Sequence, residues 1–434
     1  MFDILIKNGL VIDGSGKAGF QADVAVEDGR LAEVGLLPAA EAATVIDATG
    51  LVVAPGFIDM HSHADFSLPV CPTAESLVHQ GITTAVVGQC GYSPVPLLKE
   101  TRAHLIRQMD ASMGRSGERL PWDRWASFKT YVEDLSRTGT SLNIVPLVGQ
   151  GTVRAGVVGY GPGPATPEQR AKMTAVVAQA MEDGAFGLST GLIYPPGSFT
   201  ETDEIAAIAK PVGDRGGIYF SHIRGEADTL LAAITEAIRI GRESGAAVQI
   251  SHFKVAGRKN WDTVERALAL IDKARAEGLN VTADLYPYLA GSTGLSALLP
   301  QWAHEGGKEA TAKRLKDPGV REKMTLSMKS EGFAKDMEWN QVLISFAPGK
   351  PEYEGHYVVE LAKAQGKSPY DWLYDALIET GLRATMVTFM MSEQNRLRDL
   401  RHPAMMIGTD GMGYALSGSM SDGLPHPRNY GTFP

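Results

Sequence analysis

Residues 56–63 read Gly-Phe-Ile-Asp-Met-His-Ser-His, an apolar run that ends in two histidines separated by one residue. In a β-strand, side chains two positions apart lie on the same face. We therefore expect His61 and His63 to point the same way where a strand stops, about 7 Å apart along the backbone. Neutral imidazole is a common ligand for zinc-like metals. On its own, such a pair is as typical of a turn or a surface pair as it is of a metal site.

Further metal-binding residue types follow other short β-like runs. Cys90 ends the run 83–90, His222 ends 217–222, His252 ends 247–252 and Asp410 ends 404–410. Taken singly, each of these residues fits a structural role, such as a buried thiol or a turn. A (β/α)8 barrel, however, gathers its active-site residues at the C-terminal ends of several strands. The whole pattern predicts one metal site with the ligands His61, His63, Cys90, His222, His252 and Asp410.

The order of apolar runs and helical stretches predicts the barrel itself. Strand-like runs occupy residues 57–61, 83–88, 144–149, 185–188, 217–222, 247–252, 280–285 and 404–410. Helical stretches alternate with them, and the helix after Thr166 has a capping residue followed by proline at its first position. Alternating strands and helices indicate a parallel sheet with right-handed crossovers. Eight such units predict a closed (β/α)8 TIM barrel over residues 56–434.

Two regions lie outside this repeat. Residues 1–55 read as short strands and turns, including an Asp28-Gly29 hairpin signal, and predict a small β-domain. A charged segment rich in Lys and Glu lies near residues 300–345, between the last two strands. We interpret it as a helical insertion beside the mouth of the active site, without a core of its own.

The composition excludes several functional classes. The chain has 434 residues, of which 44% are hydrophobic and 21% charged, and its net charge is −9. No Lys/Arg-rich run is present, which disfavours nucleic-acid binding. No apolar run is long enough to suggest a membrane span. Cys71 and Cys90 are the only cysteines, so a disulfide framework is excluded and a cytoplasmic location is expected.

Several stretches together resemble the amidohydrolase superfamily and, within it, the N-acyl-D-amino-acid deacylases or D-aminoacylases. The resemblance covers essentially the whole chain. It is carried by Pro-Gly-Phe-Ile-Asp-Met-His-Ser-His (55–63), Gly-Gln-Cys-Gly (88–91), Gly-Leu-Ser-Thr-Gly-Leu-Ile-Tyr-Pro-Pro-Gly (187–197), Ser-His-Ile-Arg (221–224), Ser-His-Phe-Lys (251–254), Asp-Leu-Tyr-Pro-Tyr (284–288), Gly-Thr-Asp-Gly (408–411) and His-Pro-Arg-Asn-Tyr-Gly-Thr-Phe-Pro (426–434).

The resemblance implies a zinc-dependent hydrolysis of N-acyl-D-amino acids to a carboxylate and a free D-amino acid. It implies one tight zinc site made by Cys90, His222 and His252. A second, weaker site would use His61, His63, the shared Cys90 and Asp410. Asp410 would also take a proton from the attacking water and pass it to the leaving amine.

Recognition of the substrate carboxylate is expected from Arg428. A guanidinium can hold a carboxylate through two parallel hydrogen bonds, which lysine cannot reproduce. By resemblance, the pocket around this group is completed by Tyr194, Lys254, Tyr286 and Ser292.

One departure from the family concerns the C-terminus, because only 24 residues follow Asp410. Relatives continue with strands that return to the N-terminal β-domain. We therefore expect a composite β-sandwich that lacks its C-terminal strands, completed by a separate C-terminal polypeptide unless the chain is truncated.

Two alternative functions stay open at this point. One is a cyclic-amide hydrolase of the hydantoinase or dihydroorotase kind, although no lysine ends an early barrel strand to bridge two metals, and Arg428 favours a linear substrate. The other is a non-catalytic, metal-binding subunit of a split enzyme.

Overall fold

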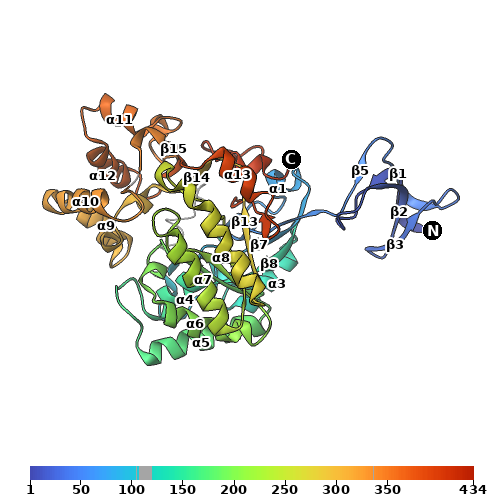
Figure 1. Cartoon of the computed structure of the whole chain (residues 1–434), viewed down its shortest axis with the longest axis horizontal. Coiled ribbons are helices and arrows are strands. Elements are labelled where there is room, and N and C mark those ends of the chain that lie inside the picture. The colour runs from blue at the N-terminus through green and yellow to red at the C-terminus, as the bar shows by residue number, and fades with distance from the viewer. Residues whose placement is uncertain (104, 107–119, 336) are drawn as a thin grey trace. The chain divides into compact units, whose positions relative to one another are not determined.

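The chain folds into two compact units, Met1–Phe57 and Ile58–Pro434, which are described separately here (Figure 1). The computed structural model describes residues 1–103, 105–106, 120–335 and 337–434. Among these residues, no helix is both long enough and apolar enough to cross a membrane.

The first unit is a five-stranded sheet with the strand order β3-β2-β1-β4, in which β5 also pairs with β1. Its strands are β1 (Phe2–Val11), β2 (Phe20–Glu27), β3 (Arg30–Gly35), β4 (Ala42–Asp47) and β5 (Val52–Val53). β2 and β3 are antiparallel and are joined by the predicted Asp28-Gly29 turn. Both turn residues have positive φ, at 52° and 70°, as a tight hairpin of this type requires.

The two faces of this sheet differ in burial. Val11, Ala22 and Val24 form a small buried cluster. Leu31, Val45 and Val52 remain 70%, 57% and 56% exposed. Residues 1–57, all of them described, thus form a single layer, and the second layer of the expected sandwich does not come from them.

The second unit contains the predicted barrel. Its strands are β6 (Phe57–Asp59), β7 (Ile82–Val87), β8 (Asn143–Pro146), β9 (Val148–Gly149), β10 (Gly187–Gly191), β11 (Ile218–His222), β12 (Ala247–Ile250), β13 (Val281–Leu285) and β17 (Met405–Ile407). β6, β7 and β8 form one run of neighbours, and β9 to β13 followed by β17 form the other. The fourth strand begins two residues later than the predicted run 185–188.

Backbone hydrogen bonds join these two runs into a closed barrel. β8 pairs with β7 and β9 pairs with β10, so the two short strands act as one interrupted strand around Leu147. At the other junction, Met60 N donates to Ile407 O at 3.2 Å, and Ser62 forms a parallel bridge with Gly411. In the described part of the chain, eight strand positions therefore close the ring, which confirms the predicted (β/α)8 barrel.

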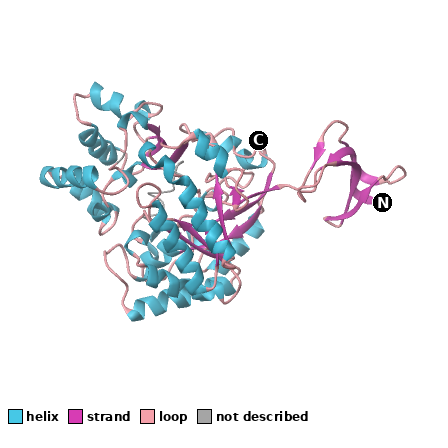
Figure 2. Cartoon of the chain, in the orientation of Figure 1, coloured by secondary structure: helices cyan, strands magenta, loops and turns pink. Residues whose placement is uncertain are grey.

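Helices cover the outside of the barrel strands (Figure 2). They are α1 (Glu75–Val78), α3 (Phe128–Thr138), α4 (Gln150–Val157), α5 (Pro167–Glu182), α6 (Thr202–Gly213), α7 (Leu230–Ser244), α8 (Val264–Ala276) and α13 (Glu393–Asp399). The short helix α14 (Arg428–Gly431) follows the last barrel strand and contacts α1. The predicted cap of α5 is present, because Thr166 accepts a hydrogen bond from Gln169 N and Pro167 occupies the first turn. The apolar sides of α5 to α8 pack on the strands and make the main core.

The insertion between β13 and β17 is larger than expected. It comprises β14 (Ala290–Gly294), α9 (Lys308–Leu315), α10 (Pro318–Ser330), β15 (Val342–Phe346), α11 (Val358–Ala364), α12 (Pro369–Glu379) and β16 (Thr385–Phe389). Its helices group together, apart from α5 and α6 of the barrel (Figure 1).

The expectation that this insertion lacks a core is wrong. Buried residues from Leu295 to Met386 form a hydrophobic cluster around Trp372 and Tyr374. The three strands form an antiparallel sheet in the order β14-β16-β15. Because these apolar residues are spread over about 90 positions between charged ones, a window of local sequence such as 300–345 does not reveal their common core.

Candidate metal centre

Three of the predicted ligands lie in unusual backbone conformations at strand ends. The φ angles of Cys90, His252 and Asp410 are 55°, 37° and 48°. Positive φ is uncommon outside glycine and clusters at active sites. At each position the strand stops and the chain turns sharply. This turn lets the side chain face the mouth of the barrel instead of continuing the alternation of the strand.

The glycine that follows Cys90 makes this turn possible. Gly91 has a φ of 77°, and a Cβ added there would lie 2.7 Å from the backbone nitrogen of Gly191. The turn after β7 therefore packs directly against the end of β10. A side chain at position 91 would push Cys90 away from the other ligands.

Cys90, His222 and His252 form one cluster of potential ligand atoms. Cys90 Sγ lies 3.5 Å from His222 Nδ1 and 3.6 Å from His252 Nε2. The two nitrogens are 2.8 Å apart. In a tetrahedral zinc site, sulfur and nitrogen ligands are separated by about 3.6 Å, as follows from the usual bond lengths. The two sulfur-to-nitrogen distances match this geometry, whereas the two nitrogens are closer than the roughly 3.3 Å that the same bond lengths give, so the imidazoles would have to move slightly apart to share one zinc ion.

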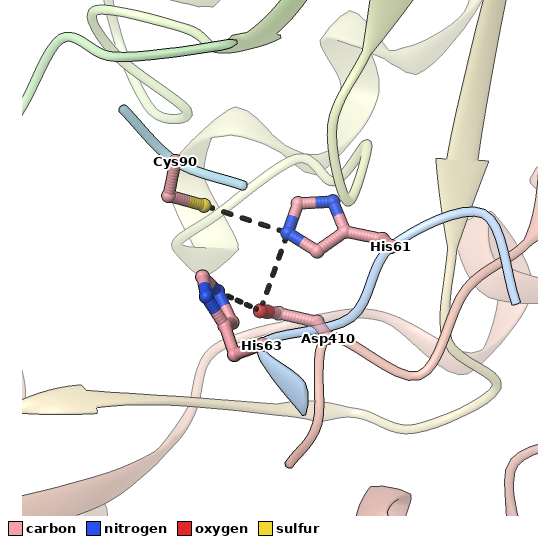
Figure 3. Close-up of side chains that lie close together, drawn as sticks. All are labelled: His61, His63, Cys90 and Asp410. Atoms are coloured by element: carbon pink, nitrogen blue, oxygen red, sulfur yellow. Dashed lines mark hydrogen bonds and ion pairs between the residues drawn. The ribbon is translucent and has the colours of Figure 1, made fainter. Parts of the chain in front are cut away.

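A second cluster shares Cys90 with the first and adds His61, His63 and Asp410 (Figure 3). His61 Nε2 lies 3.4 Å from Cys90 Sγ and 3.5 Å from Asp410 Oδ1. His63 Nε2 lies 3.3 Å from the same carboxylate oxygen. In each of the two clusters, the potential ligand atoms are within 4.8 Å of one another. The structure thus brings all six predicted ligands together at one end of the barrel.

The chemistry of these groups fits zinc. Thiolate, imidazole and carboxylate are its usual protein ligands. Burial raises the pKa of the Cys90 thiol, but His61 and hydrogen bonds from His222 and His252 outweigh this effect and hold the pKa well below its usual range. A low pKa favours the thiolate, which is the form that binds metals. The residues present can therefore hold the metal that the family resemblance implies.

Two carboxylates behind the ligands were not predicted as site residues. Asp284, at the end of β13, places Oδ1 3.2 Å from His61 Nδ1 and accepts a hydrogen bond from His252 N at 2.7 Å. Glu226 Oε1 lies 3.0 Å from His252 Nδ1. Each carboxylate can hold the proton of one imidazole on Nδ1, which leaves Nε2 free to bind a metal.

These carboxylates differ in how visible they are in the sequence. Asp284 belongs to the stretch 284–288 and lies at the end of a barrel strand, so its position could have identified it as a site residue. Glu226 lies in the loop after β11, four residues beyond His222, where no local pattern distinguishes it from a solvent-exposed glutamate. Its contact with His252 arises only because β11 and β12 are neighbours.

Arg428 lies beside the second cluster. Its Nη1 is 2.8 Å from Asp410 Oδ2, and its Nη2 donates to the carbonyl oxygen of Ser292 at 3.2 Å. The guanidinium also stacks 4.9 Å from the centre of the Tyr286 ring. Its Nε is buried and has no hydrogen-bond partner among the described residues. Arg428 therefore brings a positive charge to the wall of the cavity and keeps one buried N–H, on Nε, without a partner among the described residues.

The other predicted substrate-binding residues line the same cavity. Lys254 Nζ lies 2.6 Å from Glu226 Oε1 and 5.8 Å from the centre of the Tyr286 ring. The hydroxyl of Tyr194 is 2.9 Å from Thr293 Oγ1, and its ring lies against His222. Lys254 is thus paired with a carboxylate of the protein, whereas Ser292 meets Arg428 through its backbone.

The cavity has a volume of about 340 Å³ and is lined by both the barrel and the insertion. Cys90, His222 and Asp410 lie at its barrel end, and residues of α9 and of the segment before β16 complete its wall. The insertion therefore helps to shape the space in front of the two ligand clusters.

Comparison with known proteins places this arrangement in a family. Residues 44–214 match the model of the amidohydrolase family. A D-aminoacylase from Alcaligenes xylosoxydans xylosoxydans is 35% identical over 433 residues, which cover 100% of this chain and 78% of that protein.

Two solved structures agree over the full chain. The N-acyl-D-glutamate deacylase from Bordetella bronchiseptica, solved with zinc and a phosphonate inhibitor, is 30% identical with a TM-score of 0.81. A D-aminoacylase studied for its binuclear metal centre is 33% identical with a TM-score of 0.77. Both matches cover 100% of this chain and 79% of the other. Since each relative spans the matched region as one polypeptide, the expected separate C-terminal polypeptide is not supported.

Proposed function

The chain belongs to the D-aminoacylase and N-acyl-D-amino-acid deacylase branch of the amidohydrolase family, and we propose that it hydrolyses the linear amide bond of N-acyl-D-amino acids with the help of zinc. The observation that carries this proposal is the sharing of Cys90 by two ligand clusters, next to an arginine that faces the same cavity. The first feature suits metal-assisted hydrolysis, and the second suits a substrate with a free carboxylate.

In this proposal Cys90, His222 and His252 hold the tight zinc ion. His61, His63, Cys90 and Asp410 hold a second and weaker one. A zinc ion held by these residues would supply Lewis-acid chemistry, because it would make a water molecule more acidic and would polarise the amide carbonyl. Cys71 and Cys90 are both free, and a cytoplasmic location, where thiols stay reduced, is part of the proposal.

Asp410 moves the proton in this reaction. Its carboxylate accepts a proton from the attacking water and returns it to the nitrogen of the breaking C–N bond, so that the products are a carboxylate and an amine. Burial raises the pKa of Asp410, but Arg428 and His61 outweigh it and hold the pKa well below its ordinary value. Asp410 is therefore ionised, which is the form that a proton acceptor must have.

Arg428 binds the α-carboxylate of the substrate. In the structure its Nη1 contacts Asp410, while its Nε has no partner among the described residues. A substrate carboxylate can therefore pair with Arg428 without first breaking the contact with Ser292. Tyr286 supports the guanidinium from one side, and Lys254, whose charge is paired with Glu226, lies 5.8 Å from the centre of the same ring.

A linear substrate fits this site better than a cyclic amide. Cys90 is the one ligand common to both clusters, so the site needs no lysine to bridge two metals. Arg428, which is paired with Asp410, can bind a free carboxylate that lies next to the reacting amide. The same intact set of ligands argues against a subunit that only binds metal.

The test is amine release from matched substrates. Zinc-loaded enzyme is incubated with N-acetyl-D-leucine or N-acetyl-L-leucine, and free amino groups and bound zinc are measured. We expect release from the D substrate alone. Asp410→Asn should abolish it, whereas the exposed control Asp262→Asn should leave it unchanged. No release from either enantiomer by zinc-bound enzyme would overturn the proposal.

A further inference from the structure

A second cavity lies next to the one that contains the ligand clusters. Its volume is about 790 Å³, which is in the range of cavities that bind small molecules. Residues 224–229 and 256–258, which follow β11 and β12 of the barrel, line it together with residues of the insertion. The chemistry proposed above makes no use of this space.

The two cavities meet at a set of apolar side chains. The apolar residues that line both are Ile193, Ala297, Leu299, Phe333 and Met390. Ile193 follows β10 of the barrel, and the others belong to the insertion or directly follow its strand β16. Ala297 is the smallest of them and is half-buried. A ligand that fills the first cavity can therefore continue into the second along an apolar border.

The second cavity also comes close to the ligand clusters. Glu226, which borders both cavities, lies 3.0 Å from His252 Nδ1 and 2.6 Å from Lys254 Nζ. On the same wall, Arg224 Nη2 donates to Glu236 Oε1 at 2.9 Å. These charges are compensated within the protein, so an apolar ligand beside them leaves no charge without its partner.

Further apolar side chains belong to the second cavity. Leu298, Phe389 and Met391 line it. Phe389 is 44% exposed, although it is a large apolar residue. Trp261 Nε1 donates to the carbonyl oxygen of Met390 at 3.2 Å, which fixes the chain beside Phe389. An apolar ligand in this space would remove ring and aliphatic surface from water, which is favourable.

The second cavity lies on the side to which the acyl group of the substrate would point. Asp410, which returns the proton to the amide nitrogen, follows β17 and contacts Arg428 at 2.8 Å. The nitrogen and the α-carboxylate of the substrate are therefore expected near β17. The acyl chain leaves the carbonyl carbon on the side away from the nitrogen. β12 and β11, whose loops line the second cavity, are separated from β17 by β13.

We propose that the second cavity binds the acyl chain, so that the enzyme prefers N-acyl-D-amino acids with a long apolar acyl group to their N-acetyl analogues. The inference rests on the proposed function and specifies its substrate class. Each methylene group that the cavity buries can raise kcat/KM by up to about fourfold.

The experiment compares two isomeric substrates that carry the same heptyl chain at different places. In N-octanoyl-D-alanine the chain belongs to the acyl group, and in N-acetyl-D-2-aminononanoate it is the amino-acid side chain. N-acetyl-D-alanine is the reference for both. We expect kcat/KM for N-octanoyl-D-alanine to exceed that for N-acetyl-D-alanine by about tenfold or more, which burial of a few methylene groups supplies. It should also exceed that of its isomer.

Two variants of the native enzyme test where the chain lies. Ala297→Phe should narrow the junction between the cavities, and Phe389→Ser should make the second cavity more polar. Each should reduce the ratio of kcat/KM between N-octanoyl-D-alanine and N-acetyl-D-alanine toward one. Ala364→Phe, at an exposed alanine of the same insertion, should leave this ratio unchanged. If Ala297→Phe does not fold, Phe389→Ser still provides the test.

The outcomes separate this inference from the proposed function. Hydrolysis of all three substrates without a preference for N-octanoyl-D-alanine, or with a preference for its isomer, would overturn the acyl site and leave the proposed function intact. A preference that both variants retain would also overturn it. If no substrate is hydrolysed, the proposed function fails, and calorimetric binding of the two isomers then judges the site. Equal affinities would reject the site, whereas tighter binding of N-octanoyl-D-alanine that Phe389→Ser weakens would support it.

Discussion

Replacing Arg428 with lysine should weaken the recognition of the substrate carboxylate while preserving the positive charge. The guanidinium is buried, contacts Asp410 at 2.8 Å and Ser292 at 3.2 Å, and stacks on Tyr286. Lysine cannot maintain these contacts and also present a second donor to a carboxylate. Losing one hydrogen bond between charged groups costs about 1.5–3 kcal/mol. We therefore expect kcat/KM for N-acetyl-D-leucine to fall by about 10- to 100-fold.

The assay must separate this loss from any disturbance of Asp410, which Arg428 also contacts. We would measure kcat/KM for N-acetyl-D-leucine and for N-acetyl-D-leucinamide, which lacks the α-carboxylate, with both enzymes. The native enzyme should discriminate strongly between the two substrates. The Arg428→Lys enzyme should discriminate much less, because it holds the α-carboxylate less well. Damage to Asp410 would instead lower the activity toward both substrates alike and leave their ratio unchanged. The exposed Arg398→Lys serves as the control for a surface arginine.

The reasoning is refuted if Arg428→Lys retains the full discrimination against the amide. That result would mean that another group, such as Lys254, holds the α-carboxylate. An equal loss of activity toward both substrates would point to a role of Arg428 in positioning Asp410.

Three further changes test other parts of the site and the fold. Cys90→Ser should remove zinc from both clusters and abolish activity, as read by zinc content after dialysis, because serine is a much weaker zinc ligand. Glu226→Gln should weaken zinc binding by about 10- to 100-fold in chelator competition, since Glu226 orients His252. Burial raises the pKa of Asp399 to about 7, so the folded chain keeps a proton that the unfolded chain releases near pH 4. The fold therefore loses stability as pH rises between these values, and Asp399→Asn should stabilise it by about 1–4 kcal/mol at pH 8 relative to pH 4 in urea unfolding.

Each of these changes has a contradicting result. Full zinc content in Cys90→Ser would show that the thiol is not a ligand. Unchanged zinc affinity in Glu226→Gln would show that His252 keeps its orientation without the carboxylate. For Asp399→Asn, an equal change in unfolding free energy at both pH values would mean that the native carboxyl titrates near its ordinary pKa.

Much of the barrel could be predicted because its signals are local. Each strand is a short apolar run, and the ligand residue follows directly where the run ends, as in the stretches that finish at His222 and Asp410. Closure of the ring then brings these ends together. The proximity of the six predicted ligands thus follows from strand order alone.

The remaining features depend on contacts between distant segments. Glu226 meets His252 and Lys254 only after β11 and β12 become neighbours. The core of the insertion joins Leu295 to Met386, so no short window of sequence contains it. The positive φ of Cys90 could not be predicted from the sequence either, although Gly91 beside it is the residue that permits such a turn.

The central claim is that the Cys90 clusters bind the zinc that supports hydrolysis of D substrates. The most direct test adds zinc to metal-free enzyme while release of D-leucine from N-acetyl-D-leucine is followed. We predict no activity without metal, a rise that is largely complete after the first equivalent of zinc per chain, and no such rise in Cys90→Ser. Full activity of the metal-free enzyme, or a zinc-dependent preference for N-acetyl-L-leucine, would contradict the account.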